Sequence, residues 1–313
     1  MAETPAPGAA IRLPDSFGAR ADDVLSGRLQ PAAPRDAATV MLLRTSPDAG
    51  EPGGPAGAGR GAAGAAGGPG GPAGGDSGLE VYLLRRQPTM AFAPGAVVFP
   101  GGSVDPRDAD SELSWAGPDP AEWGRLLGAP PQLARALVCA AVRETFEESG
   151  VLLAGPDTGS IVADTRDGDW EADRQALLDR SLSLAGLLAR RRLVLRSDLL
   201  RPWARWITPV TEERRYDTRF FAAELPHGQL TRDVGGEADR VAWLAPATAL
   251  AAARRHEIFL LPPTAVSLGE LAACHGLDAA LAARRRIAPL MPEVTVANGA
   301  VWLTVPADVE YPL

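Results

Sequence analysis

The sequence contains no lysine, so all 31 of its basic residues are arginine. This absence excludes a lysine nucleophile and a lysine Schiff base. The only cysteines are Cys139 and Cys274, and neither belongs to a C-x-x-C pair. That pattern argues against a structural zinc site and against a disulfide scaffold. The three histidines are scattered and lack the spacing of metal ligands.

Long apolar runs are also missing. No apolar segment approaches the roughly 18 residues of a membrane span, and the first residues lack the basic start and apolar stretch of a signal peptide. We therefore expect a soluble, cytoplasmic protein with no membrane partner. The net charge of −8 argues against a nucleic-acid partner, whose signature is a basic surface. A small anionic substrate remains possible because local arginines can override the net charge.

The length of 313 residues and the 46% hydrophobic content fit one large domain or two small ones. We expect an N-terminal extension over residues 1–36 and a single domain over residues 37–313. Residues 46–78 are almost wholly Gly, Ala and Pro, which cannot offset the entropy of ordering by burial, so we expect a disordered loop. A domain boundary is the alternative, but the lone strand before it would have no core.

The hydrophobic pattern predicts an α/β (α+β) fold. Apolar segments predict strands at 38–44, 79–86 and 96–99, a helix at about 132–149 and an amphipathic helix at 170–192. Further helices are expected from Pro246 and in a pair broken at Gly276. The chain should end in a hairpin that turns at Asn298 and Gly299. A mixed sheet flanked by helices, with helical insertions, accommodates these elements.

Three carboxylates stand out in the segment "RETFEESGV". Glu144, Glu147 and Glu148 occupy positions i, i+3 and i+4, so a helix places them on one face within a turn. Two such anions about 4 Å apart repel by roughly 4 kcal/mol at an effective dielectric near 20. An all-oxygen cluster suits Mg²⁺ or Mn²⁺ and does not suit zinc. The alternative is a solvated acidic face, which is the usual meaning of an acidic run.

An apolar strand and a Gly-Gly turn precede this segment at Gly101 and Gly102. Together the two pieces resemble the Nudix box, G-x5-E-x7-R-E-U-x-E-E-x-G-U, in which U is apolar. The second half matches from Arg143 to Val151, and only Thr145 departs from it. This resemblance implies an α/β/α sandwich with a mixed sheet, and the predicted C-terminal hairpin lies outside the part of the chain that it covers. It also implies hydrolysis of a diphosphate linked to another group.

The first half of the box matches less closely. Asp108 stands where the pattern has Glu, and the stretch from Asp108 to Arg143 is far longer than seven residues. We place an insertion at 109–131 and expect a surface excursion with a short helix. The first acidic residue of the pattern is thus either replaced by Asp108 or missing. Because its role in the family is mainly architectural, we expect activity to survive this departure.

Several other stretches narrow the resemblance. "YLLRRQPTMAFAPGAVVFPGG", the insertion inside the box, "WARWITP" and "RRYDTRFF" resemble the peroxisomal coenzyme A diphosphatase branch of the Nudix hydrolases. This branch implies cleavage of coenzyme A or acyl-coenzyme A to 3′,5′-ADP and (acyl-)phosphopantetheine. The final "YPL" is not a peroxisomal S-K-L signal, so the compartment does not carry over with the chemistry.

The resemblance implies a role for each matching residue. Glu144, Glu147 and Glu148 are expected to bind Mg²⁺ or Mn²⁺, which would bridge the diphosphate and activate a water molecule. Arg143 is expected to orient a glutamate through a fork of two charge-assisted hydrogen bonds, and Glu147 is the first candidate. Gly101 and Gly102 are expected to let the backbone pass close to the metal and phosphates.

The general base and the substrate-binding residues are less well defined. Glu148 or Glu237, in "GGEADRVAW", is the candidate base, and Glu237 is otherwise a solvated loop residue. Arg85 and Arg86 end a strand beside the box and could bind phosphate, unless they are simply solvated. Arg219 alternates with apolar neighbours and so points either away from the core or into the site.

Other functions remain open on the sequence alone. A Nudix pyrophosphatase of the same mechanism could act on ADP-ribose, a dinucleotide or a noncanonical nucleotide. A catalytically silent Nudix-like binding module is a further possibility, although such modules usually lose one of the carboxylates that stand here. The C-terminal hairpin and helix pair could form the face of a homodimer.

Overall fold

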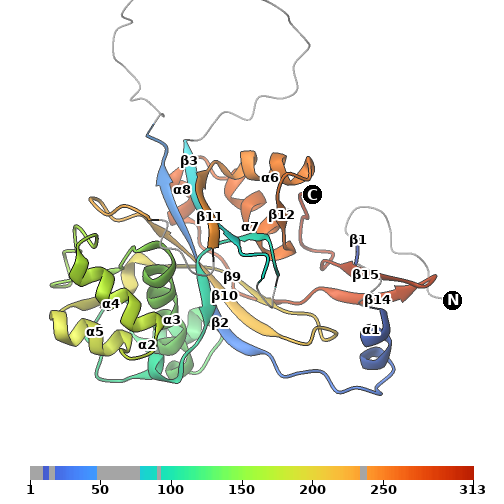
Figure 1. Cartoon of the computed structure of the whole chain (residues 1–313), viewed down its shortest axis with the longest axis horizontal. Coiled ribbons are helices and arrows are strands. Elements are labelled where there is room, and N and C mark those ends of the chain that lie inside the picture. Colours follow the sequence, from blue (N-terminus) through green and yellow to red (C-terminus); the bar gives the residue numbers. More distant parts are fainter. Residues whose placement is uncertain (1–9, 14–17, 48–77, 90–92, 233–237) are drawn as a thin grey trace, which may run out of the picture.

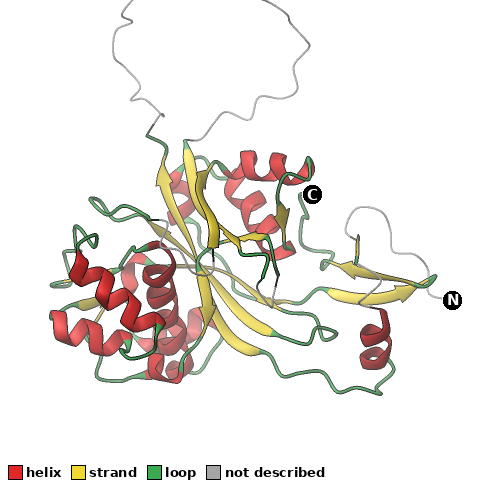
Figure 2. Cartoon of the chain, in the orientation of Figure 1, coloured by secondary structure: helices red, strands yellow, loops and turns green. Residues whose placement is uncertain are grey.

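The computed structural model describes residues 10–13, 18–47, 78–89, 93–232 and 238–313. In these residues a mixed sheet is covered by helices on both faces (Figures 1 and 2). The predicted α/β/α sandwich is therefore confirmed. Most of the predicted loop at 46–78, from residue 48 to residue 77, lies outside the described residues. No helix in the described ranges is long and apolar enough to cross a membrane.

The main sheet is built around β2 (Arg35–Thr45), whose residues 37–38 and 40–43 are buried. β2 runs parallel to β10 (Tyr216–Glu224) and antiparallel to β3 (Leu79–Arg86) and β5 (Gly101–Ser103). The main path through the sheet is β12-β4-β3-β2-β10-β9-β13, and β11 and β5 pair with β3 and β2. The remaining strands of this sheet are β4 (Ala96–Val98), β9 (Arg201–Ile207), β11 (Ala238–Leu244), β12 (Phe259–Leu260) and β13 (Pro289–Leu290).

Alternation along β2 divides the core into two layers, because successive strand residues point to opposite faces. Val40 and Leu42 pack in one layer, and Met41 and Leu43 pack in the other. The first layer contains α2 (Pro120–Leu127), α3 (Pro131–Ser149), α4 (Gly168–Leu178) and α5 (Leu184–Arg191). The second contains α6 (Pro246–Arg254), α7 (Pro262–Ala272) and α8 (Leu277–Ala282), with Gly276 between the last two as predicted.

The predicted C-terminal hairpin is present but lies outside the main sheet. β14 (Glu293–Ala297) and β15 (Ala300–Thr304) pair antiparallel, and Asn298 and Gly299 at the turn have φ of 53° and 78°. Residues of the N-terminal extension cover this hairpin. β1 (Ala10–Arg12) pairs with β15, and α1 (Gly18–Leu25) packs against the small sheet in an arm beside the main body (Figure 1).

A third small sheet joins β6 (Trp115–Ala116), β8 (Val194–Arg196) and β7 (Ala154–Gly155) beside α3. The helix predicted at 170–192 is wrong as a single element, since α4 ends at Leu178 and α5 begins at Leu184. Arg180 takes a left-handed φ of 59°, and the Ser183 side chain accepts a hydrogen bond from Gly186 N. These local features end one helix and cap the next, although the apolar stripe continues across the break.

The insertion is also more deeply buried than predicted. Trp123 on α2 is 1% exposed, and its ring meets the ring of Phe221 edge to face at a centroid distance of 5.8 Å. Leu127, one turn later, is fully buried. The expectation of a surface excursion is therefore wrong for α2, because this short helix contributes to the core layer over the sheet.

We predict that Trp123→Ala lowers the free energy of unfolding by roughly 3–5 kcal/mol, because it removes a large buried side chain and leaves a cavity. Urea denaturation at equilibrium measures this change. Leu126 lies on the same helix and is 41% exposed, so Leu126→Ala should cost about 0.5 kcal/mol or less. Equal costs for the two variants would contradict a core role for the insertion.

Candidate active site

The candidate site lies at the C-terminal end of α3. This helix begins at Pro131 and ends at Ser149, and Gly150, the next residue, has a φ of 73°. Proline is favoured in the first turn of a helix, and glycine is favoured in the left-handed conformation just after the last turn. Val138, Val142 and Phe146 form the apolar side of this helix and are buried in the core layer. Burial of that side fixes the position of the glutamates in the last two turns.

Arg143 is the centre of the site and is only 8% exposed. Its Nε and Nη2 contact the Asp108 carboxylate at 3.1 and 3.0 Å. Nη1 donates to Glu144 Oε1 at 2.8 Å and approaches both Glu147 carboxylate oxygens at 3.2 Å. Nη2 also donates to the Ser103 carbonyl at 2.9 Å. The expected contact with Glu147 is present, but the two-nitrogen fork goes to Asp108.

Asp108 is held in place by the short 3₁₀ helix η2 (Pro106–Ala109). Asp105 caps this helix, since its side chain accepts from Arg107 N at 2.9 Å and its own N–H donates to Asp108 Oδ2 at 2.8 Å. Arg107 in turn donates to the Arg180 carbonyl at 2.8 Å, which ties η2 to the connection between α4 and α5. Asp108 therefore provides an acidic partner to Arg143 despite the long insertion that follows it.

The two glycines of β5 lie directly against the glutamates. The Gly101 N–H donates to Glu148 Oε2 at 2.8 Å. A Cβ atom on Gly102 would lie 2.5 Å from Glu144 Cδ, so any side chain at this position would displace the carboxylate. The predicted close approach of the backbone thus has a definite geometry. Pairing of Gly102 with Ala38 of β2 fixes the strand that makes this approach.

Burial perturbs the acids of this cluster. It raises the pKa of Glu144 to about 7, against the opposing effect of Arg143. It also raises the pKa of Asp108 and of Glu147, which Arg143 again opposes. Burial alone would lower the pKa of Arg143, but the surrounding carboxylates outweigh it and raise that pKa. The guanidinium is therefore always charged, whereas the acids are crowded and poorly solvated.

The charges and donor atoms of this cluster fit a divalent cation. Three carboxylates share the single guanidinium of Arg143, and Glu148 adds a fourth negative group nearby. All the side-chain donors are oxygen atoms, which suits Mg²⁺ or Mn²⁺. In the part of the chain that the structure describes, no three acidic, histidine or cysteine side chains are already gathered around one ion position. The carboxylates instead contact Arg143 and the Gly101 N–H.

The four remaining predicted site residues are Arg85, Arg86, Arg219 and Glu237. Arg219 is 1% exposed and pairs with Asp217 at 2.8 Å and with Asp36 at 3.3 Å, so its charge is already matched. Arg86 falls in the same alternation as Tyr82 and Leu84, which face α3, whereas Arg85 falls on the opposite face of β3. Glu237 lies outside the described residues. The roles of all four remain predictions.

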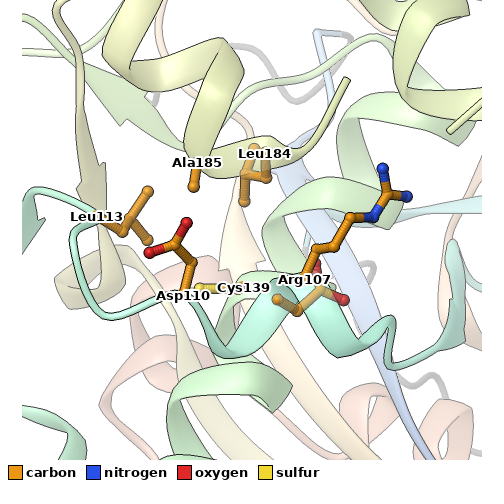
Figure 3. A pocket seen from close by; sticks show the side chains of 7 residues that line it. Arg107, Asp110, Leu113, Cys139, Leu184 and Ala185 are labelled. Atoms are coloured by element: carbon orange, nitrogen blue, oxygen red, sulfur yellow. The ribbon is translucent and has the colours of Figure 1, made fainter. Parts of the chain in front are cut away.

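Two features near the site were not found from the sequence. Arg174 on α4 donates to the Glu147 carbonyl at 2.8 Å, although nothing in the motif points to it. A small hollow also lies between η2, α3 and α5 (Figure 3). Burial raises the pKa of the Cys139 thiol, which is that of a small core residue. Besides Asp108 and Cys139, the lining consists of Arg107, Asp110, Leu113, Leu184 and Ala185.

Known proteins resemble this chain in sequence. A family model described as the NUDT19 Nudix domain matches residues 124–271, which include α3 and its glutamates. The chain is 29% identical over 236 residues to acyl-coenzyme A diphosphatase NUDT19 of Xenopus laevis, covering 64% of this chain and 60% of that protein. It is 28% identical over 231 residues to the human protein of the same name, covering 62% and 61%. The aligned part thus spans about three fifths of these relatives.

A solved structure also resembles it. The crystal structure of a NUDIX hydrolase from Alicyclobacillus acidocaldarius aligns with a TM-score of 0.63 and 27% sequence identity. The alignment covers 82% of this chain and 98% of that protein. The similarity therefore extends well beyond the motif.

The crowded acids predict an unusual pH dependence of stability without divalent ions. The pKa of Glu144 is about 7 in the folded protein and 4.5 without burial, as in the unfolded chain. Between these pH values the folded state therefore binds a proton that the unfolded state has released. We predict that the free energy of unfolding falls as pH rises from about 5 to 8, by at most roughly 1.4 kcal/mol per pH unit. Urea denaturation in the presence of EDTA measures it.

Glu144→Gln should flatten this slope, because an amide does not titrate. Glu112→Gln, which changes an exposed carboxylate of the insertion, is the control and should leave the slope as it is. A wild-type protein whose stability is constant or rises over this pH interval would contradict the raised pKa of Glu144.

Proposed function

Because the chain is a member of the Nudix family, we propose that it is a metal-dependent hydrolase that cleaves the diphosphate of coenzyme A or acyl-coenzyme A. The products would be 3′,5′-ADP and (acyl-)phosphopantetheine. The observation that carries the proposal is the arrangement at the end of α3. There Arg143 gathers Asp108, Glu144 and Glu147. Diphosphate hydrolysis needs a dense set of hard oxygen ligands of this kind.

The choice of coenzyme A among diphosphates rests on two kinds of support. The relatives in Xenopus laevis and Homo sapiens bear the name acyl-coenzyme A diphosphatase. The segments "YLLRRQPTMAFAPGAVVFPGG", "WARWITP" and "RRYDTRFF" resemble the same branch. These segments form β3 to β5, β9 and β10, which are the strands around β2. The support for coenzyme A as the substrate thus comes from segments of the main sheet as well as from the motif on α3.

Glu144, Glu147 and Glu148 would hold the Mg²⁺ or Mn²⁺ ion. When bound, such an ion neutralises the charge that develops on the diphosphate and lowers the pKa of a water molecule. The fit of the residues present is one of charge and donor type, as described above. Glu237, which lies outside the described residues, stays a candidate ligand or base in this proposal.

The chain's own residues would position the reaction. Arg143 keeps Glu144 and Glu147 at the end of α3 through its Nη1 contacts, at 2.8 and 3.2 Å. The Gly101 N–H donates to one oxygen of the Glu148 carboxylate at 2.8 Å and so orients this group, which is the proposed acceptor of the water proton. Arg86, on the α3 side of β3, is the proposed partner of a substrate phosphate.

We predict that the purified protein, supplied with Mg²⁺ or Mn²⁺, releases 3′,5′-ADP from coenzyme A. Separation of the products by HPLC identifies the bond that is cleaved. Glu148→Gln should lower kcat by roughly 10²-fold or more, because it removes a metal ligand and the proposed base. Glu112→Gln changes an exposed carboxylate of the insertion, so it serves as the matched control and should keep the wild-type rate.

Parallel incubations with ADP-ribose, NADH and dGTP separate the alternatives. AMP from ADP-ribose or from a dinucleotide, or inorganic diphosphate from a triphosphate, would keep the hydrolase and overturn the coenzyme A assignment. Absence of turnover with every substrate, at both metals, would favour a silent binding module.

A further inference from the structure

Helix α4 contacts the last turn of α3 through two residues that lie one turn apart. The Trp170 ring meets the Phe146 ring edge to face, at a centroid distance of 6.0 Å and an angle of 79°. Arg174 Nη1 donates to the carbonyl oxygen of Glu147 at 2.8 Å. Positions i and i+4 of a helix share one face, so a single side of α4 holds two consecutive residues of α3. One of these is a proposed metal ligand.

Arg174 is fixed on both sides of its guanidinium. Only 1% of the residue is exposed. Its Nε and Nη2 form a fork with the Glu171 carboxylate, at 2.9 and 2.6 Å. A buried arginine needs such a partner to offset the loss of hydration. The fork orients the planar guanidinium and thereby aims Nη1 at the Glu147 carbonyl.

The contact falls where α3 has carbonyl groups without partners inside the helix. The last four carbonyls of an α-helix lack an N–H four residues further on. Arg174 supplies a donor for Glu147, and the Arg232 N–H supplies one for Ser149 at 3.0 Å. Arg232 Nη1 also reaches Glu171 at 3.5 Å. Both cations lie at the negative end of the helix dipole, where positive charge is favourable.

We propose that Arg174 is a positioning residue for the metal-binding glutamates. By fixing the Glu147 carbonyl, it sets the backbone of the turn from which Glu147 and Glu148 project. This proposal rests on the proposed function, because it concerns the same metal-binding residues. It adds a residue from α4, which lies outside the motif. Its expected effect is on metal affinity, because outer residues that orient ligands are typically worth about 10- to 100-fold in affinity.

The test is a titration of the full-length protein with Mn²⁺ in the absence of substrate, followed by isothermal calorimetry or by the EPR signal of free Mn²⁺. We expect the dissociation constant for Mn²⁺ to rise about tenfold in Arg174→Gln. Arg174→Lys keeps the charge but loses the fork, so it should recover part of this loss. Circular dichroism sets a temperature at which every variant is folded.

Arg190→Gln is the matched control. Arg190 lies on α5 and pairs with Asp173 of α4, so this variant also removes an arginine from a carboxylate of α4. Asp173 accepts from Arg190 and Arg191 on α5, and no contact of Arg190 with α3 is present among the described residues. We expect Arg190→Gln to change Mn²⁺ affinity by less than about twofold, even where it lowers the melting temperature.

The possible outcomes are distinct. If Arg174→Gln is folded and binds Mn²⁺ as tightly as wild type, Arg174 only stabilises the fold and the proposal is overturned. If Arg174→Gln does not fold, Arg174→Lys and Glu171→Gln decide in the same way, with a several-fold loss of affinity expected for each. A wild-type protein that binds no Mn²⁺ would instead overturn the proposed function, and this inference with it.

Discussion

The site depends on one interaction, the set of contacts that the Arg143 guanidinium makes with three segments of the chain. It joins Asp108 of η2, the Ser103 carbonyl of β5 and two glutamates of α3. A buried arginine without partners is very unfavourable, and so are buried carboxylates without a cation. Each group therefore requires the others. The residual negative charge of the cluster is the reason for proposing that it binds a divalent ion.

This dependence explains how the motif tolerates a long insertion. The entropic cost of a longer loop grows slowly, provided that its two ends are held. One end is held by Asp108, through the Asp105 cap and its contact with Arg143. The other end is the start of α3, and between them α2 buries Trp123 against the sheet. The insertion thus adds to the core layer that supports α3 and leaves the glutamates where the motif requires them.

Part of this arrangement could be predicted from the sequence, because it depends on local rules. Helical spacing placed Glu144, Glu147 and Glu148 together, and Asn298 with Gly299 marked the hairpin turn. The break between α4 and α5 was missed because an apolar stripe continued across a local cap.

Contacts between distant segments could not be predicted from the sequence for a different reason. The contact of Arg174 with Glu147 joins residues far apart in sequence, and no local pattern distinguishes a buried arginine from a solvated one.

The most direct test of the account is the free energy of unfolding as a function of Mg²⁺ concentration near neutral pH, for wild type and Glu144→Gln. If the cluster binds the ion, wild type gains about 2.7 kcal/mol at a hundredfold excess over Kd, and the variant gains much less. Stability that does not respond to Mg²⁺ in the wild-type protein would contradict the account.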